Sequence, residues 1–251
     1  MEDVFSQPGT GARFDWGPAG AAELARACAV IVVVDVLSFT TAVDVAVGRG
    51  MRVHPFPWDR QAAVYAERIG AALAVGRGQL SAERPWSLSP ASLARAPTVT
   101  DLVLPSPNGA AICSAAASTG VPVVAACLRN SHAVAEWLHF QGYGRPSSPI
   151  GVVAAGELWP DGTLRPGMED LLGAAAVLDG LSMMDTSLSV EAAVALAALA
   201  SVPDVPAVIR RCVSGQELIN GGYREDVEIA VTIGGSTVVP ILTADAFTAA
   251  T

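Results

Sequence analysis

Short runs of apolar residues, many of them β-branched, alternate along the chain with alanine-rich stretches. Val30–Val34, residues 101–104, residues 121–126 and Ile150–Ala154 have the length and composition of buried strands. Most of these runs are followed by a polar turn and then by a stretch of helical periodicity. Strands that alternate with helices predict an α/β fold, in which a mostly parallel or mixed sheet lies between two layers of helices.

The same patterns predict the remaining elements. We expect helices over residues 42–47, 60–69, 110–118, Ser131–Phe140, 168–181, Val190–Ala200 and 214–220, and further strands over residues 53–56, 73–75 and 238–242. Residues 76–97 are rich in serine, proline, arginine and tryptophan and lack a clean period, which predicts a long loop over the sheet edge or over a functional site. The 251 residues fit one domain that spans the chain.

Composition and charge exclude several classes of function. A formal net charge of −9 argues against nucleic acid and anionic membranes as partners, because both bind basic surfaces. The apolar runs stop well short of the ~20 residues that a membrane-spanning helix needs, and the N-terminus lacks the pattern of a secretory signal, so a cytoplasmic location is expected. The four cysteines form no C-x-x-C pair, which favours reduced thiols. The many apolar residues are compatible with a homodimer.

Polar side chains follow three of the predicted strands, where loops lead into helix N-termini. They are Asp35 with Ser38, Thr40 and Thr41; Asn108 with Gly109; and Arg129 with Asn130. In α/β proteins ligands bind beyond the carboxyl ends of strands, and the free N–H groups of helix N-termini favour anions. Each set also has a structural interpretation. Asp35 would cap the next helix while the threonine hydroxyls bond to the backbone, Asn108-Gly109 would form a tight turn, and Asn130 would cap a helix beside a solvated Arg129.

Further acids are candidates for a metal site. Glu169 and Asp170 fall in the first turn of a predicted helix, Glu157 follows a strand, and Asp226 opens the last unit. Hard cations such as Mg²⁺ take carboxylate oxygens as ligands. The alternatives are that the helix dipole favours Glu169 and Asp170 at their positions, and that Glu157 and Asp226 are ordinary loop acids. No Walker A loop, G-x-S-x-G elbow, H-E-x-x-H or complete G-x-G-x-x-G motif occurs, which disfavours P-loop, dinucleotide and serine hydrolase chemistry.

Five segments occur in a fixed order along the chain. They are DVLSFTTA from Asp35, PNGAA from Pro107, LRNSHAVAEWL from Leu128, AAGELWPDGTLRPGMEDLLGAAAVL from Ala154 and SGQELINGGYREDVEIA from Ser214. Together they resemble the 2-phosphosulfolactate phosphatase family, in order from about Val30 to Leu242. The resemblance implies a single α/β domain and Mg²⁺-dependent hydrolysis of the phosphate monoester 2-phosphosulfolactate, a step toward coenzyme M.

The resemblance assigns candidate site residues by matching position, and the chemistry of the side chains adds others. The expected catalytic residues are Asp35, Glu169, Asp170 and Arg129. The expected substrate-binding residues are Ser38, Thr40, Thr41, Arg77, Asn108, Gly109, Asn130 and Gly156. The candidate Mg²⁺ ligands are Asp35, Glu157, Glu169, Asp170 and Asp226. Whether Asp35 holds the metal or acts as a nucleophile or general base is open at this point.

The chain departs from the family pattern at several motif positions. The family usually reads D-V-L-R-A-T-T, where this chain has Ser38 and Phe39 in place of arginine and alanine. A family G-E pair aligns with Gly76-Arg77, and the family's G-N-S-P appears here with Leu88 in place of the asparagine. Serine cannot supply the charge or the five-donor fork of an arginine. Three explanations are open: Arg77 compensates from another loop, the phosphoester substrate has changed, or the chain is a non-catalytic anion-binding homologue.

Overall fold

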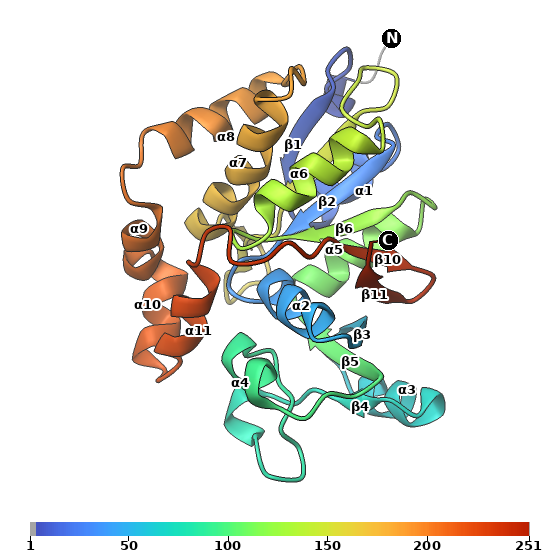
Figure 1. Cartoon of the computed structure of the whole chain (residues 1–251), viewed down its shortest axis with the longest axis vertical. Helices are drawn as coiled ribbons and strands as arrows, with labels where there is room; N and C mark the ends of the chain where they lie inside the picture. The colour runs from blue at the N-terminus through green and yellow to red at the C-terminus, as the bar shows by residue number, and fades with distance from the viewer. Residues whose placement is uncertain (1–3, 251) are drawn as a thin grey trace.

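The computed structural model describes residues 4–250. Within them, a nine-stranded sheet and a two-stranded ribbon are combined with eleven α-helices (Figure 1). The strand order of the large sheet is β1-β7-β2-β6-β10-β11-β3-β5-β4. Parallel and antiparallel neighbours both occur, so the predicted α/β fold with a mixed sheet is confirmed.

The bounds of the elements follow the chain. The strands of the large sheet are β1 (Ala12–Trp16), β2 (Val30–Val34), β3 (Arg52–Pro57), β4 (Ala72–Leu73), β5 (Asp101–Ser106), β6 (Val123–Ala126), β7 (Ile150–Ala154), β10 (Pro240–Thr243) and β11 (Ala246–Ala249). The ribbon pairs β8 (Glu157–Leu158) with β9 (Leu164–Arg165). The helices are α1 (Gly17–Leu24), α2 (Phe39–Gly48), α3 (Gln61–Ile69), α4 (Pro90–Arg95), α5 (Gly109–Ala117), α6 (Ser131–Phe140), α7 (Met168–Ser182), α8 (Val190–Ala200), α9 (Val205–Arg211), α10 (Val213–Asn220) and α11 (Arg224–Ala230).

Two parallel blocks of strands are joined by an antiparallel hairpin. β1, β7, β2 and β6 run parallel to one another, as do β3, β5 and β4. The β10–β11 hairpin bridges the blocks through the first residues of β6 and β3, since Ile241 faces Val124 and Phe247 faces Val53. The hairpin therefore pairs only near the amino ends of these two strands and does not cover the carboxyl ends of β2, β5 and β7.

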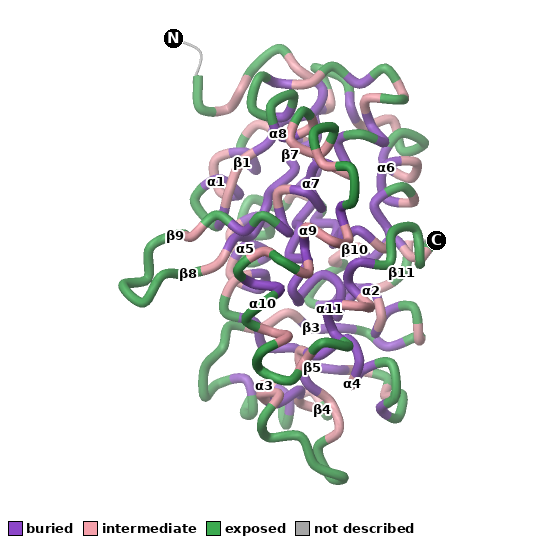
Figure 2. Tube along the Cα trace, turned by 90° about the vertical axis from the view of Figure 1, so that its left-hand side faces the viewer, coloured by how far each residue is buried: buried purple, intermediate pink, exposed green. Residues whose placement is uncertain are grey.

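The core lies on both faces of the sheet because β2 is apolar at every position. Its five residues are fully buried; Val30, Val32 and Val34 pack against α6, α7 and α8, whereas Ile31 and Val33 pack against α1, α2 and α5. The buried tube in Figure 2 runs through these central elements, and exposed segments lie mostly in the connecting loops. A strand buried on both faces is a rigid support for the residue that follows it, Asp35.

Several elements differ from the sequence-based expectation. The predicted loop over residues 76–97 contains α4, which starts after Ser89 because the Ser89 hydroxyl accepts a hydrogen bond from the Ser92 N–H at 3.1 Å. The other helices and strands that the periodicity did not predict are β1, α1, β8, β9, α9, α11 and β11. These elements are short, and most of their sequences mix charges, glycine or proline into the apolar pattern. Their secondary structure therefore depends on tertiary packing more than on local preference.

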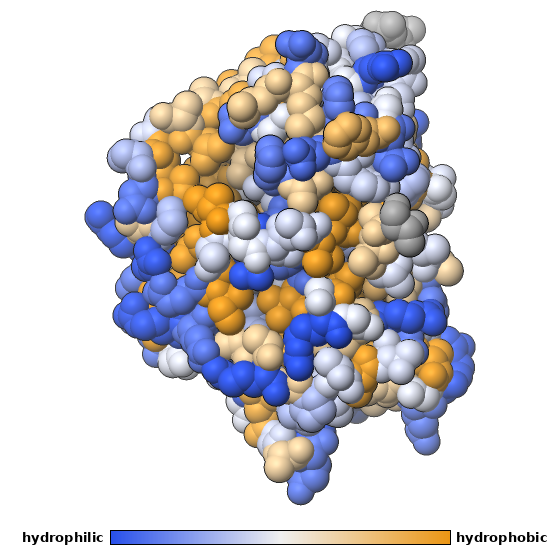
Figure 3. Space-filling model, viewed as in Figure 1, coloured by the Kyte–Doolittle hydropathy of each residue, from blue (hydrophilic) through white to orange (hydrophobic). Residues whose placement is uncertain are grey.

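Apolar and polar side chains are unevenly distributed over the face of the molecule seen in Figure 3. Figure 3 shows apolar side chains along α8, where Val190 and Val194 are exposed, and polar side chains around α10 and α11. Within residues 4–250 no single helix has the length and apolar character to cross a membrane, although the bent pair α8 and α9 meets the length and composition criteria when taken together.

Candidate active site

The loop after β2 is held together by its own polar groups. The Asp35 carboxylate accepts a hydrogen bond from the Phe39 N–H at 2.9 Å, at the start of α2. The hydroxyls of Thr40 and Thr41 donate to the carbonyl oxygens of Asp35 and Val36 at 2.7 and 2.8 Å. Both threonines are fully buried. Their hydroxyls therefore bind backbone carbonyl oxygens, the arrangement of the structural interpretation, and their expected phosphate-binding role stays a prediction.

A small polar cavity opens beside this loop. Its volume is about 180 Å³. Its walls are formed by Asp35, Leu37, Ser38, Arg77, Leu88, Ser106, Pro107, Asn108, Glu157, Ser214, Glu217 and Leu218. These residues come from segments that are far apart in the sequence, and most belong to loops and helix starts. We refer to this space as the Asp35 cavity.

The cavity forms where the carboxyl ends of three strands meet. Asp35 follows β2, Asn108 follows β5, and Glu157 follows β7. The Asn108 side-chain amide donates to the Glu157 carboxylate at 2.8 Å, which links the two parallel blocks of the sheet directly. The predicted meeting of Asp35, Asn108 and Glu157 at one crevice is thus present in the structure.

Burial perturbs the acids of the cavity. It raises the pKa of Asp35 to about 6, an effect that the Phe39 N–H opposes and the neighbouring Glu169 charge reinforces. It raises the pKa of Glu157 to about 7, with the charge of Asp35 adding to the effect and the Asn108 amide opposing it. Both carboxyls therefore titrate close to neutral pH, as acids at functional sites often do.

Glu169 and Asp170 lie in the first turn of α7, just behind the cavity. The two oxygens of Asp170 accept hydrogen bonds from the N–H groups of Val36 at 2.7 Å and Gly156 at 2.8 Å. Asp170 therefore ties together the loops after β2 and β7, and burial beside Glu169 raises its pKa well above the usual range. Glu169 accepts a hydrogen bond from the Cys212 thiol at 3.3 Å. Neither acid lines the cavity, so Asp170 acts on the site as a support.

Arg77 is the cation of the cavity. Its Nε donates to the Asp226 carboxylate at 2.9 Å, and one Nη donates to the Ser38 hydroxyl at 2.7 Å. Asp226 is buried and also accepts hydrogen bonds from the Ser89 hydroxyl and, at 3.1 Å, from the Ala91 N–H. Asp226 thus accepts hydrogen bonds from three protein donors and holds Arg77 in place, and its expected role as a metal ligand stays a prediction. The contact with Ser38 puts the Arg77 guanidinium beside the position where the family usually has its arginine.

Arg129 and Asn130 are not brought to the cavity. Arg129 donates through Nε to Asp44 at 2.7 Å, and it lines a separate hollow of about 720 Å³ together with residues 234–238. The Asn130 side chain accepts from the Cys127 N–H at 2.8 Å and donates to the carbonyl oxygens of Ala125 and Val238. Asn130 therefore fixes the end of β6 to the segment before β10. Neither residue lines the Asp35 cavity, and their expected roles in substrate binding and charge pairing stay predictions.

Two glycines near the cavity are required by close packing. A Cβ on Gly109 would collide with the ring of Phe39, so the larger residue at position 39 is accommodated only because position 109 has no side chain. Gly156 has φ +66°, and a Cβ there would lie 2.8 Å from the Leu164 side chain. Both glycines shape the loops around the cavity, and neither lines it.

Three cavity residues from α10 were not expected at the site. Ser214, Glu217 and Leu218 form one face of this helix and close the cavity on the side opposite the sheet. The segment SGQELINGGYREDVEIA could have indicated these residues, because it matches the family pattern. Asp226 was the only residue of this segment among the expected site residues. Local sequence alone does not reveal that this helix folds back over the ends of the strands.

Metal ligation is restricted by these contacts. Within the described part of the chain, no three histidine, cysteine, aspartate or glutamate side chains stand in an arrangement that could hold a metal ion. Of the five candidate ligands, Asp170 and Asp226 are committed to protein donors. Asp35 and Glu157 line the cavity, and Glu169 lies close enough for its charge to raise the pKa of both.

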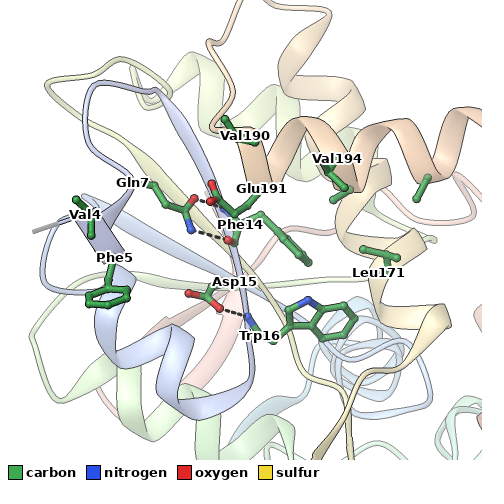
Figure 4. Close-up of a pocket in the computed structure, with 12 residues that line it drawn as sticks. Val4, Phe5, Gln7, Phe14, Asp15, Trp16, Leu171, Val190, Glu191 and Val194 are labelled. Carbon is green, nitrogen blue, oxygen red and sulfur yellow. Dashed lines mark hydrogen bonds between the residues drawn. The ribbon is translucent and has the colours of Figure 1, made fainter.

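A larger and more apolar hollow lies away from this chemistry. Its volume is about 580 Å³, and Phe14, Trp16, Leu171 and Val194 are among the residues around it (Figure 4). The acid Asp15 at its edge bonds to the neighbouring Trp16 N–H at 2.7 Å. The residues that line it include Gln7, Asp15 and Glu191 but no cation, so this hollow is a poorer candidate for binding a phosphate than the Asp35 cavity.

An α/β sheet with a small polar cavity beyond the carboxyl ends of its strands, lined here by Asp35, Glu157 and Arg77, is typical of α/β enzymes that bind small ligands at that place. The family model described as 2-phosphosulpholactate phosphatase matches residues 19–245. The chain belongs to this family, and it is accordingly a phosphoric monoester hydrolase of that type. The match includes every element that contributes to the Asp35 cavity.

Proposed function

We propose that this protein hydrolyses a small acidic phosphate monoester, 2-phosphosulfolactate or a close relative, to the free hydroxy acid and phosphate with the help of Mg²⁺. One observation carries the proposal: a single small cavity brings the fixed cation Arg77 to the acids Asp35 and Glu157. The family membership supplies the type of reaction, and the cavity supplies the limits on the substrate.

The size of the cavity favours a small substrate. Its volume of about 180 Å³ lies below the roughly 300–1,000 Å³ of sites for drug-sized ligands. A three-carbon acid with one phosphate is compatible with such a space, whereas a nucleotide is too large for it.

The roles of the side chains follow from charge. A phosphate monoester dianion repels nucleophiles, so its hydrolysis depends on neutralising charge and on aligning the attacking oxygen. Arg77 offers a guanidinium that Asp226 and Ser38 already orient, and Asn108 offers a neutral amide. In this proposal the two side chains bind the phosphate oxygens and hold the ester in line with the attacking group.

The acids present suit Mg²⁺ by donor chemistry. Mg²⁺ usually takes one or two carboxylates and fills its remaining positions with water and substrate phosphate, so a cage of three protein acids is not required. Asp35 and Glu157 would hold the ion, with Glu169 behind them. Burial raises the pKa values of Asp35 and Glu157, and the charges of the neighbouring acids add to the effect. When bound, Mg²⁺ would neutralise phosphate charge and lower the pKa of a bound water molecule.

The position of Asp35 fits two roles in catalysis. Its carboxylate is oriented by the Phe39 N–H and supported from β2, as a metal ligand requires. The same fixed carboxylate would also suit a nucleophile or a general base. The two roles predict different results when the reaction is stopped with acid. A nucleophilic Asp35 would carry the phosphoryl group as a phosphoenzyme that can be trapped, whereas an Asp35 that only holds the metal would not.

The direct experiment is a phosphate-release assay on the purified chain. 2-Phosphosulfolactate, 2-phosphoglycolate and 2-phospholactate are compared, with added Mg²⁺ and with chelator. We expect turnover that depends on Mg²⁺ and is fastest for one of these acidic esters. Absence of release from all of them, under conditions where another family member is active, would reject the phosphatase proposal in favour of an anion-binding homologue.

The site is tested by Asp35→Asn with Glu67→Gln as the control. Glu67 is an exposed acid on α3, away from the cavity, so its change should leave turnover as it is. Asp35→Asn should lower kcat by about 10³-fold or more, because a group that acts on the reacting phosphate is removed. Its melting temperature should stay level or rise, because a buried carboxylate with a raised pKa becomes a neutral amide. A large loss of melting temperature with little loss of kcat would assign Asp35 to helix capping alone.

A further inference from the structure

The start of α10 holds a side chain that folding alone does not explain. Ser214 is 4% exposed, and its hydroxyl is buried without a hydrogen-bond partner. In residues 4–250 only one other buried side-chain polar atom, Arg13 Nε, shares this property. A buried hydroxyl without a partner costs free energy of folding, so folded proteins contain few of them.

Helix capping does not account for this hydroxyl. The N–H of Gly215 donates to the Cys212 sulfur at 3.4 Å, so Cys212 caps α10. At the starts of α4 and α8 the hydroxyls of Ser89 and Ser189 accept N–H groups at 3.1 Å, as capping serines normally do. Ser214 lies two residues after the cap and forms no such bond.

Ser214 is one of the residues that form the wall of the Asp35 cavity. Ser214 lines this cavity with Leu218 and Glu217, one helical turn farther along α10. The Glu217 carboxylate accepts a hydrogen bond from Arg165 at 3.0 Å, which partly neutralises it. Of these three residues of α10, Ser214 is therefore the one that carries a neutral hydroxyl donor.

The position of the hydroxyl is fixed by backbone packing. A Cβ on Gly215 would collide with the Ile209 carbonyl, so the start of α10 lies directly against the end of α9. A donor held in place before the ligand arrives loses little entropy on binding. The packing of Gly215 thus holds Ser214 in place as a preorganised ligand contact would be held.

We propose that Ser214 is a specificity-determining residue whose hydroxyl donates a hydrogen bond to the carboxylate or sulfonate that the substrate carries besides its phosphate. This inference rests on the proposed phosphatase function and extends it, because it names the group that selects acidic esters over simple ones. Arg77 and Asn108 remain for the phosphate. A neutral donor supplies direction without adding charge, which suits recognition of a second anionic group next to Asp35 and Glu157.

The test compares Ser214→Ala with the unchanged protein on two substrates. 2-Phosphoglycolate has a second acid, and ethyl phosphate does not. For 2-phosphoglycolate, KM should rise about 10-fold to 100-fold with little change in kcat, the effect of one hydrogen bond to a charged group. For ethyl phosphate both constants should stay the same. The melting temperature of the free variant should be unchanged or higher, because the lost hydroxyl had no partner.

Ser189→Ala is the matched control, because it removes a capping serine outside the cavity. It should lower the melting temperature and leave both KM values unchanged, the opposite of the pattern expected for Ser214→Ala. Three results would overturn the proposal for Ser214: unchanged KM for 2-phosphoglycolate, equal losses on both substrates, or a loss of melting temperature like that of the control.

A binding measurement separates this inference from the proposed function. Sulfolactate carries a carboxylate and a sulfonate but no phosphate, and its stabilisation of the protein is read from the melting temperature. If no phosphoester is hydrolysed but sulfolactate stabilises the unchanged protein more than Ser214→Ala, the phosphatase proposal fails and Ser214 keeps its role. Lactate and 2-hydroxyethanesulfonate then show whether the carboxylate or the sulfonate is recognised. No difference in stabilisation between the two proteins would reject the role of Ser214.

Discussion

Two buried arginine–aspartate pairs, Arg77–Asp226 and Arg129–Asp44, can be compared almost atom for atom. In each pair the arginine Nε donates to the aspartate, at 2.9 and 2.7 Å. In both pairs the arginine side chain is 17% exposed and the aspartate side chain is 1% exposed. Each aspartate also accepts a hydrogen bond from a serine, Ser89 for Asp226 and Ser236 for Asp44.

The surroundings of the two pairs differ. The remaining donors of Arg77 face the Asp35 cavity, where one of them bonds to Ser38. Those of Arg129 face a wider hollow, where one bonds to the Gly235 carbonyl at 3.3 Å. Burial and pairing are therefore equal, and the presence of acids with raised pKa values beside Arg77 is what distinguishes a candidate catalytic cation from a structural one.

The largest effect is expected when each arginine is replaced by methionine. Arg77→Met should lower kcat/KM by about 10³-fold or more, the scale associated with an arginine that neutralises charge on a transferring phosphoryl group. Arg129→Met should leave the kcat/KM of the folded protein within about 3-fold of the original, a difference of less than 1 kcal/mol. Phosphate release at a temperature where both variants are folded measures the contrast. Equal losses of activity would show that the comparison of the two pairs is wrong.

A second prediction concerns stability, for which the two pairs should behave alike. Either single arginine replacement leaves a buried aspartate without its cation and should cost about 3–5 kcal/mol. Replacing both partners, as in Arg129→Met with Asp44→Leu, should recover most of that loss because no buried charge is left unpaired. Urea unfolding measures these differences.

The equivalent double replacement at Arg77 and Asp226 provides the contrast for this experiment. It should recover stability in the same way but should not recover phosphate release. Recovery of both would mean that Arg77 has only a structural role.

A third prediction uses the pH dependence of stability to compare the surroundings of the two pairs. Burial raises the pKa of Asp35 to about 6 and of Glu157 to about 7, so the folded metal-free protein holds protons that the unfolded chain has released. This contribution to stability is fully present below the usual carboxyl pKa values and is lost as the pH rises through about 6 and 7. In the presence of chelator, the free energy of unfolding should therefore fall as the pH rises from the usual carboxyl pKa values to about 7. Asp35→Asn should flatten this fall, whereas Asp44→Asn should lower stability without flattening it.

Sequence patterns predicted the surroundings of Arg77 better than those of Arg129. Asp35, Asn108 and Glu157 were expected at the site because each follows a clear strand, and ligands of α/β proteins bind beyond the carboxyl ends of strands. Arg129 was expected there for the same reason, but its guanidinium bonds to Asp44, 85 residues earlier in the chain. Local periodicity carries no information about such a contact. The position of Ser214 at the cavity could not be predicted for the same reason, because it depends on how α10 packs against α9.

The loop residue Arg77 illustrates the opposite case. No strand or helix pattern pointed to it, and only its departure from the family's G-E pair marked it as a candidate. Its contact with Ser38 joins the two altered motif positions in space. A charge lost at position 38 thus stands beside a charge gained at position 77, which agrees with compensation from another loop and could not be read from either motif alone.

The smallest effect is expected from the serines that accompany the pairs. Ser38→Ala removes the hydroxyl that accepts a hydrogen bond from Arg77 and should lower kcat/KM by about 3-fold to 10-fold, since a net hydrogen bond contributes about 0.5–1.5 kcal/mol. Ser236→Ala removes the hydroxyl bonded to Asp44 and should cost a similar free energy of unfolding without affecting kcat/KM. Kinetics and urea unfolding on the two variants measure this contrast. If Ser38→Ala instead changes only stability, the orientation of Arg77 depends on Asp226 alone and Ser38 has no part in substrate binding.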